Sequence, residues 1–395
     1  MKCAYRHWSR RLVVAGLSAA SLLLAAPFNL AQAQEPIKVG LVAALSGQSA
    51  KSGEAIIRGL SIAISEVNAA GGINGRKLTL VSRDDESNPG KGLLAARELI
   101  QREKVAVLFG GLDSPVSLAI VPFANQVKTP FIGVWAAGTN ITRNGAKDNY
   151  VFRVSAVDAF VGEALVNYAI KKHHTKKPAM ILINNPWGES NEHALQDSLK
   201  RHNLKAVGIE KFETNDVDVV PQLTRLKQSG ADVLFMVANV APSSQVVKSL
   251  ERMGWDVPIV SHWGPAGGRF TELAGPRGES VHFIQTFTFS EKQSAKANDI
   301  LAKLKADYSV KTLADVTPAV GIANAYDALH LSALAMKKAG STDGTAIRNG
   351  FYAIDKYDGL IKTYVKPFSP SNHDALGPND YIFTHFVKGE IIPLE

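Results

Sequence analysis

Short apolar runs alternate with amphipathic stretches along the chain from Ile37 onward. The apolar run 37–45 is followed by residues with the spacing of one helix face: Ile56, Leu60, Ala63, Ile64 and Val67. Gly71 and Gly72 then give a helix stop. The opening of the chain therefore predicts a strand followed by a helix.

The same alternation recurs in two sets. Strand-like runs at 78–82, 105–111 and 130–136 are separated by helical patterns at 91–103 and 115–127. A second set of strand-like runs lies at 179–184, 206–212, 232–239 and 258–264. Helical segments at 292–308 and 316–339 and a strand-like run at 381–387 follow. Strands joined through helices lie parallel, so the pattern predicts two doubly wound α/β lobes.

The first 33 residues have the three regions of a secretory signal peptide. Lys2, Arg6, Arg10 and Arg11 precede an uncharged apolar run, and Ala31-Gln32-Ala33 is a small-x-small cleavage site. A membrane anchor is the rival interpretation, but the strongly apolar part falls short of the ~20 residues that a spanning helix needs. We expect cleavage before Gln34 and periplasmic export, with the choice between a general secretory and a twin-arginine signal left open.

Cleavage would change the bulk properties of the chain. Of 395 residues, 362 remain, which suits two domains. The four basic residues leave with the signal, so 40 Lys and Arg face 36 Asp and Glu and the net charge falls from +8 to +4. This mild excess gives no reason to expect nucleic acid binding. The sole cysteine, Cys3, also leaves, which predicts a soluble, disulfide-free protein.

Open α/β sheets bind ligands beyond the carboxyl ends of their strands. In the first predicted lobe these ends carry Ser46, Asp84 with Asp85, Ser114 and Trp135. In the second they carry Trp187, Asn239 and Trp263, so three of the five tryptophans in the chain fall on these edges. Tryptophans gathered at strand ends favour an aromatic ligand site over purely structural packing.

Catalytic chemistry has little support. Asp84 and Asp85 lack the lysine, hydroxyl or further acid that a phosphoacceptor or two-metal centre requires at neighbouring strand ends. We expect them to leave the strand before a helix capped by Asn88 and Pro89. GxSxG, HExxH, P-loop and CxxC motifs are absent, and "GGLDS" lacks the third glycine of a dinucleotide fingerprint. The sequence predicts no enzyme, no cofactor and no metal site.

Two further local patterns remain. His173 and His174, within "KKHHTKKP", fit a solvated helix C-terminus better than a metal or nucleic-acid patch. Ser114 followed by Pro115 predicts a capped helix start on the ligand edge, whose free amides bind carboxylates or phosphates.

The sequence resembles the leucine/isoleucine/valine-binding proteins, which are type I periplasmic binding proteins of ABC importers. The likeness is carried by the block from "IKVGLVAALSGQ" to "RDDESNP", by "VAVLFGG" with Ser114, by "YVFRVSAVD" and by "WGES". It covers essentially the whole chain after the signal. The family implies lobes at 37–155 with 286–377 and at 156–285 with 378–395, joined by a multi-crossover hinge that closes around ligand.

The resemblance also implies site residues. The family holds a ligand carboxylate with a serine at the position of Ser114 and with the segment of Trp135, Ala136 and Ala137. A threonine is usual where Ala137 stands, and Thr139 is the expected substitute. The tyrosine and glutamate that clamp an ammonium in the family correspond here to Asn239 and Trp263.

These departures bear on the ligand. An ammonium without a carboxylate partner is costly to bury. Ser52 and Gly321 stand where the family has larger aromatics, which predicts a wider pocket, and Trp187 keeps an aromatic wall. We expect a monomer that delivers a flat or bulky carboxylate to an ABC permease. A branched-chain amino-acid binder proper and a ligand-presenting module for a membrane sensor are the alternatives.

Overall fold

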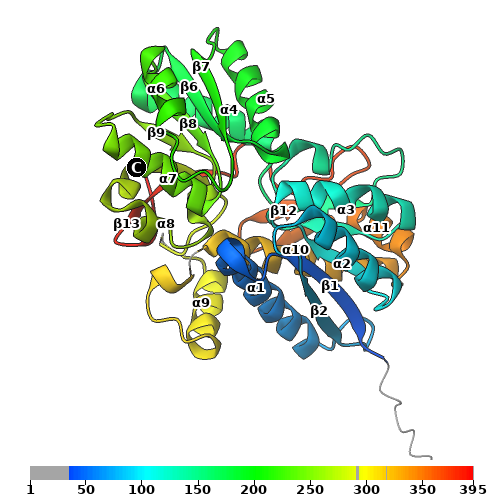
Figure 1. Cartoon of the computed structure of the whole chain (residues 1–395). Coiled ribbons are helices and arrows are strands. Elements are labelled where there is room, and N and C mark those ends of the chain that lie inside the picture. The colour runs from blue at the N-terminus through cyan, green and yellow to red at the C-terminus, as the bar shows by residue number, and fades with distance from the viewer. Residues whose placement is uncertain (1–34, 291–292, 317, 395) are drawn as a thin grey trace, which may run out of the picture. The chain divides into compact units, whose positions relative to one another are not determined.

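The computed structural model describes residues 35–290, 293–316 and 318–394. The predicted signal peptide, residues 1–33, lies outside the described residues. The strands form two separate main sheets, which belong to one compact unit of the chain. Figure 1 shows both sheets with their covering helices.

The first sheet has the strand order β2-β1-β3-β4-β5, with every neighbouring pair parallel. Its strands are β1 (Ile37–Ala43), β2 (Leu78–Asp84), β3 (Val107–Gly110), β4 (Phe131–Gly133) and β5 (Val151–Arg153). The intervening helices are α1 (Ala50–Ala69), α2 (Pro89–Gln101) and α3 (Ser114–Val127). We call this sheet and its helices the first lobe.

The second sheet has the order β14-β13-β10-β9-β8-β6-β7. Its parallel strands are β6 (Pro178–Ile183), β7 (Gly208–Phe212), β8 (Val233–Val237), β9 (Ile259–Ser261) and β10 (Val281–Gln285). The helices of this second lobe are α4 (Asp158–His173), α5 (Pro186–Arg201), α6 (Val220–Gln228), α7 (Val240–Arg252) and α8 (Phe270–Ala274). Every residue of β6 and β8 is buried, which explains why these strands read as unbroken apolar runs.

Two strands near the C-terminus depart from the parallel pattern. Strands β13 (Ile382–Val387) and β14 (Glu390–Pro393) add an antiparallel edge, with β13 pairing to β10. The prediction of two parallel, doubly wound α/β lobes is confirmed, and this antiparallel edge is an addition that the helix-strand alternation does not reveal.

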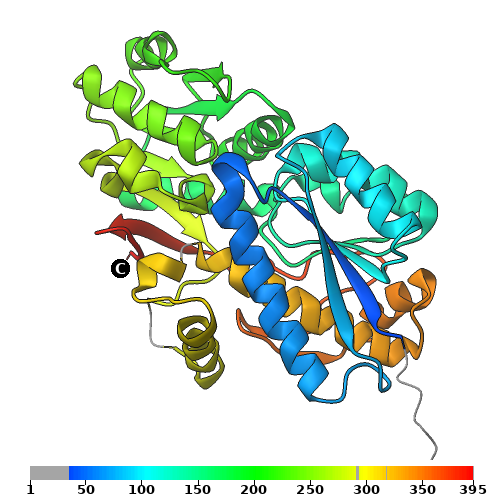
Figure 2. The same cartoon turned by 60° about the horizontal axis from the view of Figure 1, so that its bottom comes forward.

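The segment between β10 and β13 returns to the first lobe. It contains α9 (Ala295–Asp307), α10 (Ala319–Ala339), α11 (Gly344–Tyr352) and a hairpin of β11 (Lys356–Asp358) and β12 (Thr363–Val365). Helix α10 packs along α1, as Figure 2 shows from below. Gly59 permits this close approach, because a Cβ there would lie 2.2 Å from the carbonyl oxygen of Ile322.

Short 3-10 helices occur at Gly47–Ser49, Thr139–Ile141, Gly264–Gly267, Pro276–Ser280 and Leu313–Val316. The chain passes between the lobes after β5, after β10 and before β13. The boundaries predicted for the lobes at 155/156, 285/286 and 377/378 stay predictions. The strands that flank each boundary belong to different sheets: β5 and β6, β10 and β11, and β12 and β13.

The carboxylates of Asp84 and Asp85 form hydrogen bonds with nearby backbone amides. Asp84 Oδ1 accepts from the backbone amides of Leu45 and Glu86, both at 2.9 Å, and Asp85 Oδ1 accepts from Ser87 N at 2.8 Å. The Asn88 side chain caps α2 by accepting from Lys91 N at 3.0 Å, and Pro89 is the first helical residue. The predicted helix start at Asn88 is therefore confirmed.

Candidate functional site

A small cavity lies at the carboxyl ends of strands from both sheets. We call it the interlobe cavity, and its volume is about 20 Å³. Its lining from the first lobe comprises Leu112, Asp113, Ser114, Pro115, Trp135, Ala136 and Ala137. Its lining from the second lobe comprises Asn185, Trp187, Asn239 and Trp263. Seven of the ten residues singled out from the sequence thus meet here: Ser114, Trp135, Ala136, Ala137, Trp187, Asn239 and Trp263.

A second space opens beside the first. This mouth cavity has a volume of about 380 Å³ and shares Asp113, Pro115, Asn185 and Asn239 with the interlobe cavity. Its other lining residues are Ser46, Gly47, Gln48, Ser49, Glu86, Ser87, Thr214 and Pro242. No Lys, Arg or His is among the described residues that line either space.

The turn after β3 sets the position of the first-lobe wall. Gly110 has φ 135°, and a Cβ there would lie 1.9 Å from the carbonyl oxygen of Val42. Gly111, with φ 61°, leaves equally little room against Ser117. Only glycine fits at these positions, and the tight turn brings Asp113 and Ser114 to the start of α3.

The role predicted for Ser114 as a helix cap is wrong. The N-cap of α3 is Asp113, whose side chain makes no capping hydrogen bond, and Ser114 is the first helical residue. Ser114 Oγ instead accepts a hydrogen bond from Gly138 N at 3.1 Å, because the turn after β4 brings that amide over the helix start. The hydroxyl proton of Ser114 is left available to donate, and the first-turn amides of a helix favour an anion.

Two tryptophans from opposite lobes face each other across the interlobe cavity. The ring centroids of Trp135 and Trp263 are 5.5 Å apart and the ring planes are inclined by 39°. Both residues are almost fully buried. Aromatic pairs at this separation attract each other, so these indoles stabilise the contact between the two lobes.

A buried polar network positions the second-lobe tryptophans. His262 Nε2 donates to Asp158 Oδ1 at 3.0 Å, and Trp187 Nε1 donates to the same oxygen at 3.3 Å. His262 Nδ1 accepts from the backbone amide of Trp263 at 2.8 Å, which leaves Nε2 as the nitrogen that faces Asp158. Neither Asp158 nor His262 was indicated by the sequence pattern, although His262 directly follows β9 and precedes Trp263.

Hydrogen bonds cross between the lobes around the cavity. Ser52 Oγ donates to the carbonyl oxygen of Gly267 at 2.8 Å, and Asn239 Nδ2 donates to Asp113 Oδ1 at 2.9 Å. Thr139 N donates to Ser190 Oγ at 3.1 Å. The lobes are therefore in direct contact, which accounts for the small volume between them.

The widening predicted at Ser52 and Gly321 does not occur. Ser52 lines only a narrow space of about 10 Å³ beside Trp135 and bonds to the opposite lobe. A Cβ at Gly321 would lie 2.9 Å from Ala55 Cβ and 3.1 Å from the Trp135 ring. The indole of Trp135 occupies the room that the missing side chain leaves.

Thr139 is not among the residues lining the interlobe cavity, contrary to the expectation that it supplies a hydroxyl to the ligand. Its Oγ1 accepts from Ala159 N at 3.1 Å and so joins the short helix after β4 to the start of α4. The sequence spacing does not reveal this, because Ala159 follows only after β5.

The histidine pair is placed only in part as predicted. Helix α4 ends at His173, and His174 adopts the left-handed conformation of a helix C-cap. His173 is not simply solvated, since its ring stacks at 5.7 Å from that of His282. Among the described residues no cluster of histidine, cysteine and acidic side chains could hold a metal ion.

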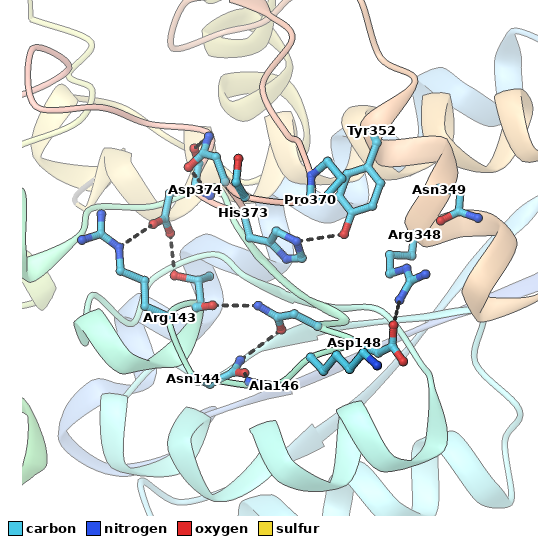
Figure 3. A pocket seen from close by; sticks show the side chains of 16 residues that line it. Arg143, Asn144, Ala146, Asp148, Arg348, Asn349, Tyr352, Pro370, His373 and Asp374 are labelled. Carbon is cyan, nitrogen blue, oxygen red and sulfur yellow. Dashed lines mark hydrogen bonds and ion pairs between the residues drawn. The ribbon is translucent and has the colours of Figure 1, made fainter.

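A larger cavity lies elsewhere in the first lobe. This N-lobe cavity has a volume of about 520 Å³ and is lined by residues 142–149, 348, 349, 352 and 370–374. Figure 3 shows how its polar side chains face one another: Arg348 pairs with Asp148 at 3.3 Å, and Tyr352 Oη lies 2.9 Å from His373 Nε2. Beneath it, the buried Arg153 pairs with Asp374 at 2.8 Å. The polar groups of this cavity therefore pair mainly with one another through ion pairs and hydrogen bonds.

The acidic residues near the interlobe cavity have shifted pKa values. Burial raises the pKa of Asp85 to about 7, with smaller contributions from the neighbouring Asp113 and Asp84. Burial also raises the pKa of Asp113, although the nearby Ser87 hydroxyl and the hydrogen bond from Asn239 oppose the shift. The described lining of the interlobe cavity thus combines the acidic Asp113, a helix start and indole surfaces without a cationic side chain.

Two α/β lobes around a cavity at their strand ends define a two-lobed solute-binding fold. A sequence model of the periplasmic binding protein family matches residues 36–386. The Leu/Ile/Val-binding protein homolog 3 of Brucella melitensis is 24% identical over 379 residues, covering 95% of this chain and 98% of that protein. The chain therefore belongs to the periplasmic binding protein family.

Solved structures share the fold. A type 1 periplasmic binding protein from Bordetella pertussis aligns with TM-score 0.84 and 22% identity, covering 91% of this chain and all of that chain. A solute-binding protein from Rhodopseudomonas palustris, in complex with 4-hydroxybenzoate, aligns with TM-score 0.77 and 22% identity over 91% of this chain and 96% of that one. A Streptococcus pneumoniae branched-chain amino acid transporter protein in complex with isoleucine aligns with TM-score 0.78 and 24% identity, covering 91% and 100%.

Proteins of this family bind small-molecule ligands outside the cytoplasm and work with ABC transporter permeases. None of the helices in the described residues is both long and apolar enough to span a bilayer.

Proposed function

We propose that this protein binds a small carboxylate with an aromatic or bulky apolar body in the interlobe cavity. It is exported by cleavage of residues 1–33 and delivers its ligand from the periplasm to an ABC permease. The observation that carries the proposal is the facing pair Trp135 and Trp263, supplied by opposite lobes beside the start of α3.

The carboxylate and the apolar body would use different parts of the cavity. The Ser114 hydroxyl and the first amides of α3 provide donors for an anion without a cationic side chain. The indoles of Trp135, Trp187 and Trp263 provide flat surfaces for the body of the ligand. Similar solved structures hold benzoates or isoleucine, and both kinds of ligand carry a carboxylate.

Binding requires movement of the lobes. A cavity of about 20 Å³ has room for little more than a water molecule. The lobes must separate to admit a ligand, and the ligand then replaces the direct contact between Trp135 and Trp263. Because the ligand touches both lobes, it stabilises a closed arrangement relative to an open one.

An amino-acid ligand is the second candidate, and Asp113 is the observation that favours it. The absence of an acid at the Trp263 position suggested that an ammonium would go unpaired. Asp113 supplies a carboxylate from the first lobe that the sequence analysis did not place at the site.

A matched ligand pair tests the proposal. The exported protein is titrated calorimetrically with 3-phenylpropanoate and with phenylalanine, which share a carboxylate and a ring and differ by the amine. We expect 3-phenylpropanoate to bind more tightly and, at about 100 times its Kd, to add ~2.7 kcal/mol to stability. Tighter binding of phenylalanine or leucine favours the second candidate, and binding of no carboxylate contradicts the proposed function.

A further inference from the structure

Asp113 has hydrogen-bonding capacity that the protein itself does not use. Its Oδ1 accepts from Asn239 Nδ2 of the second lobe at 2.9 Å, but its buried Oδ2 has no hydrogen-bond partner among the described residues. Buried carboxylate oxygens are normally paired, because leaving one without a donor costs about 1–3 kcal/mol. A structural role as helix cap does not explain the residue, since its side chain makes no capping bond.

The place of Asp113 makes this oxygen relevant to a ligand. The residue lines both the interlobe cavity and the mouth cavity, and it immediately precedes Ser114. Ser114 and the start of α3 offer donors, whereas Asp113 offers an acceptor. Two adjacent residues thus offer a hydrogen-bond donor and a hydrogen-bond acceptor to the interlobe cavity.

The described residues around Asp113 supply no partner for its Oδ2, so a group on the ligand is the remaining candidate. No lysine, arginine or histidine lines either cavity, so no described side chain there supplies a positive charge to Asp113. The Ser87 hydroxyl is near enough to oppose the rise in the pKa of Asp113, yet it stands outside hydrogen-bond geometry to Oδ2. Asn239 is already engaged with Oδ1.

We infer that Asp113 is a specificity-determining residue whose Oδ2 accepts a hydrogen bond from a donor group on the ligand, either a hydroxyl or an ammonium. This inference rests on the proposed function, because it assumes that the ligand carboxylate lies at the start of α3. The ligand would then need a hydrogen-bond donor in addition to its carboxylate. Asp113 would discriminate between acids of similar shape that carry or lack this donor.

Two ligand pairs and one isosteric variant test the inference. Kd values are measured by calorimetry for benzoate against 4-hydroxybenzoate and for 3-phenylpropanoate against phenylalanine. The Asp113→Asn variant keeps an oxygen for Asn239 but replaces the free acceptor by an amide donor. A hydrogen bond to a charged group contributes enough for about a tenfold preference or more. We expect the unaltered protein to show that preference for the donor-bearing member of one pair, and Asp113→Asn to abolish it.

Asn239→Ala is the matched control. It removes the interlobe hydrogen bond to Asp113 but leaves the Asp113 carboxylate intact, so it should weaken both members of each pair by a similar factor. The ratio of Kd values within a pair therefore separates recognition of the donor from closure of the lobes.

The pair that responds identifies the donor as a hydroxyl or an ammonium. The inference is overturned if the unaltered protein shows no preference within either pair, or if Asp113→Asn leaves the preference unchanged. The proposed function survives both results, because the carboxylates still bind. Binding of none of the four ligands overturns the proposed function and this inference together.

Discussion

The interlobe cavity and the N-lobe cavity differ both in volume and in whether their polar side chains are paired. The first measures about 20 Å³ and the second about 520 Å³. In the larger space, charged side chains such as Arg348 and Asp148 are paired with each other. In the smaller one, Asp113 keeps an unpaired oxygen and Trp135 meets Trp263 from the other lobe. Unused bonding capacity at a contact between lobes is a better sign of a ligand site than open volume.

Position in the fold supports the same distinction. The interlobe cavity lies where parallel strands of both sheets end, which is where open α/β sheets bind ligands. The N-lobe cavity lies against β5 at the edge of one sheet, where residue 374 forms a bridge to Arg153. Movement of the lobes would change the first cavity and leave the second largely as it is.

The largest expected effect comes from Trp263→Ala. This change removes an almost fully buried indole and its contact with Trp135, so the free energy of unfolding should fall by about 3–5 kcal/mol. Carboxylate affinity should fall as well, because one aromatic wall is lost. Urea unfolding and calorimetry measure the two quantities, and Trp263→Phe should lose less of each. Unchanged stability and affinity in Trp263→Ala would remove the basis for treating the indole pair as the site.

The alternation of the sequence was enough to predict the two lobes. Strands such as β6 and β8 are buried throughout, so they appear as continuous apolar runs between amphipathic helices. Chain order then predicted which strand ends share an edge, and Trp135, Trp187 and Trp263 do line one cavity. Strand β5 was not among the strand-like runs predicted from the sequence, although β4 and β9 are equally short.

The polar partners of the site were not predictable in the same way. Asp158 and His262 are 104 residues apart in sequence and meet only because the second lobe folds α4 against β9. Asp113 lies in "GGLDS", whose pattern resembles only an incomplete dinucleotide fingerprint and gives no sign of a ligand contact. Gly321 was taken to widen the pocket, whereas a neighbouring indole fills the space. Patterns of residue type reveal elements, but they do not reveal which side chain fills a given gap.

A smaller effect is expected from pH, with opposite signs for Asp85 and His373. The pKa of Asp85 is about 7 in the folded protein and near 3.8 when exposed, so the folded state holds more protons between those values. The contribution of Asp85 to stability therefore decreases as pH rises from about 4 to about 7. Burial lowers the pKa of His373 in the N-lobe cavity, so its contribution is lost instead as pH falls below about 6.5.

Asp85→Asn isolates the contribution of Asp85. Relative to the unaltered protein, this variant should gain about 1–3 kcal/mol in unfolding free energy between pH 4.5 and pH 8, because an amide has no charge to bury. Urea unfolding at several pH values gives the difference. A constant difference between the two proteins across this range would mean that Asp85 is already ionised in the folded state.

The smallest effect is expected from the N-lobe cavity, where Asp148→Asn should leave carboxylate affinity unchanged. The ion pair of Arg348 with Asp148 at 3.3 Å involves an Asp148 side chain that is 68% exposed, so solvent screens it and its loss should cost no more than about 0.5 kcal/mol. Arg348 keeps its position over the Tyr150 ring, 4.6 Å from the ring centroid, so the cavity wall should persist. Calorimetry with benzoate and urea unfolding test both expectations. A tenfold loss of benzoate affinity in Asp148→Asn, with stability unchanged, would place the ligand in the larger cavity and reverse the comparison between the two.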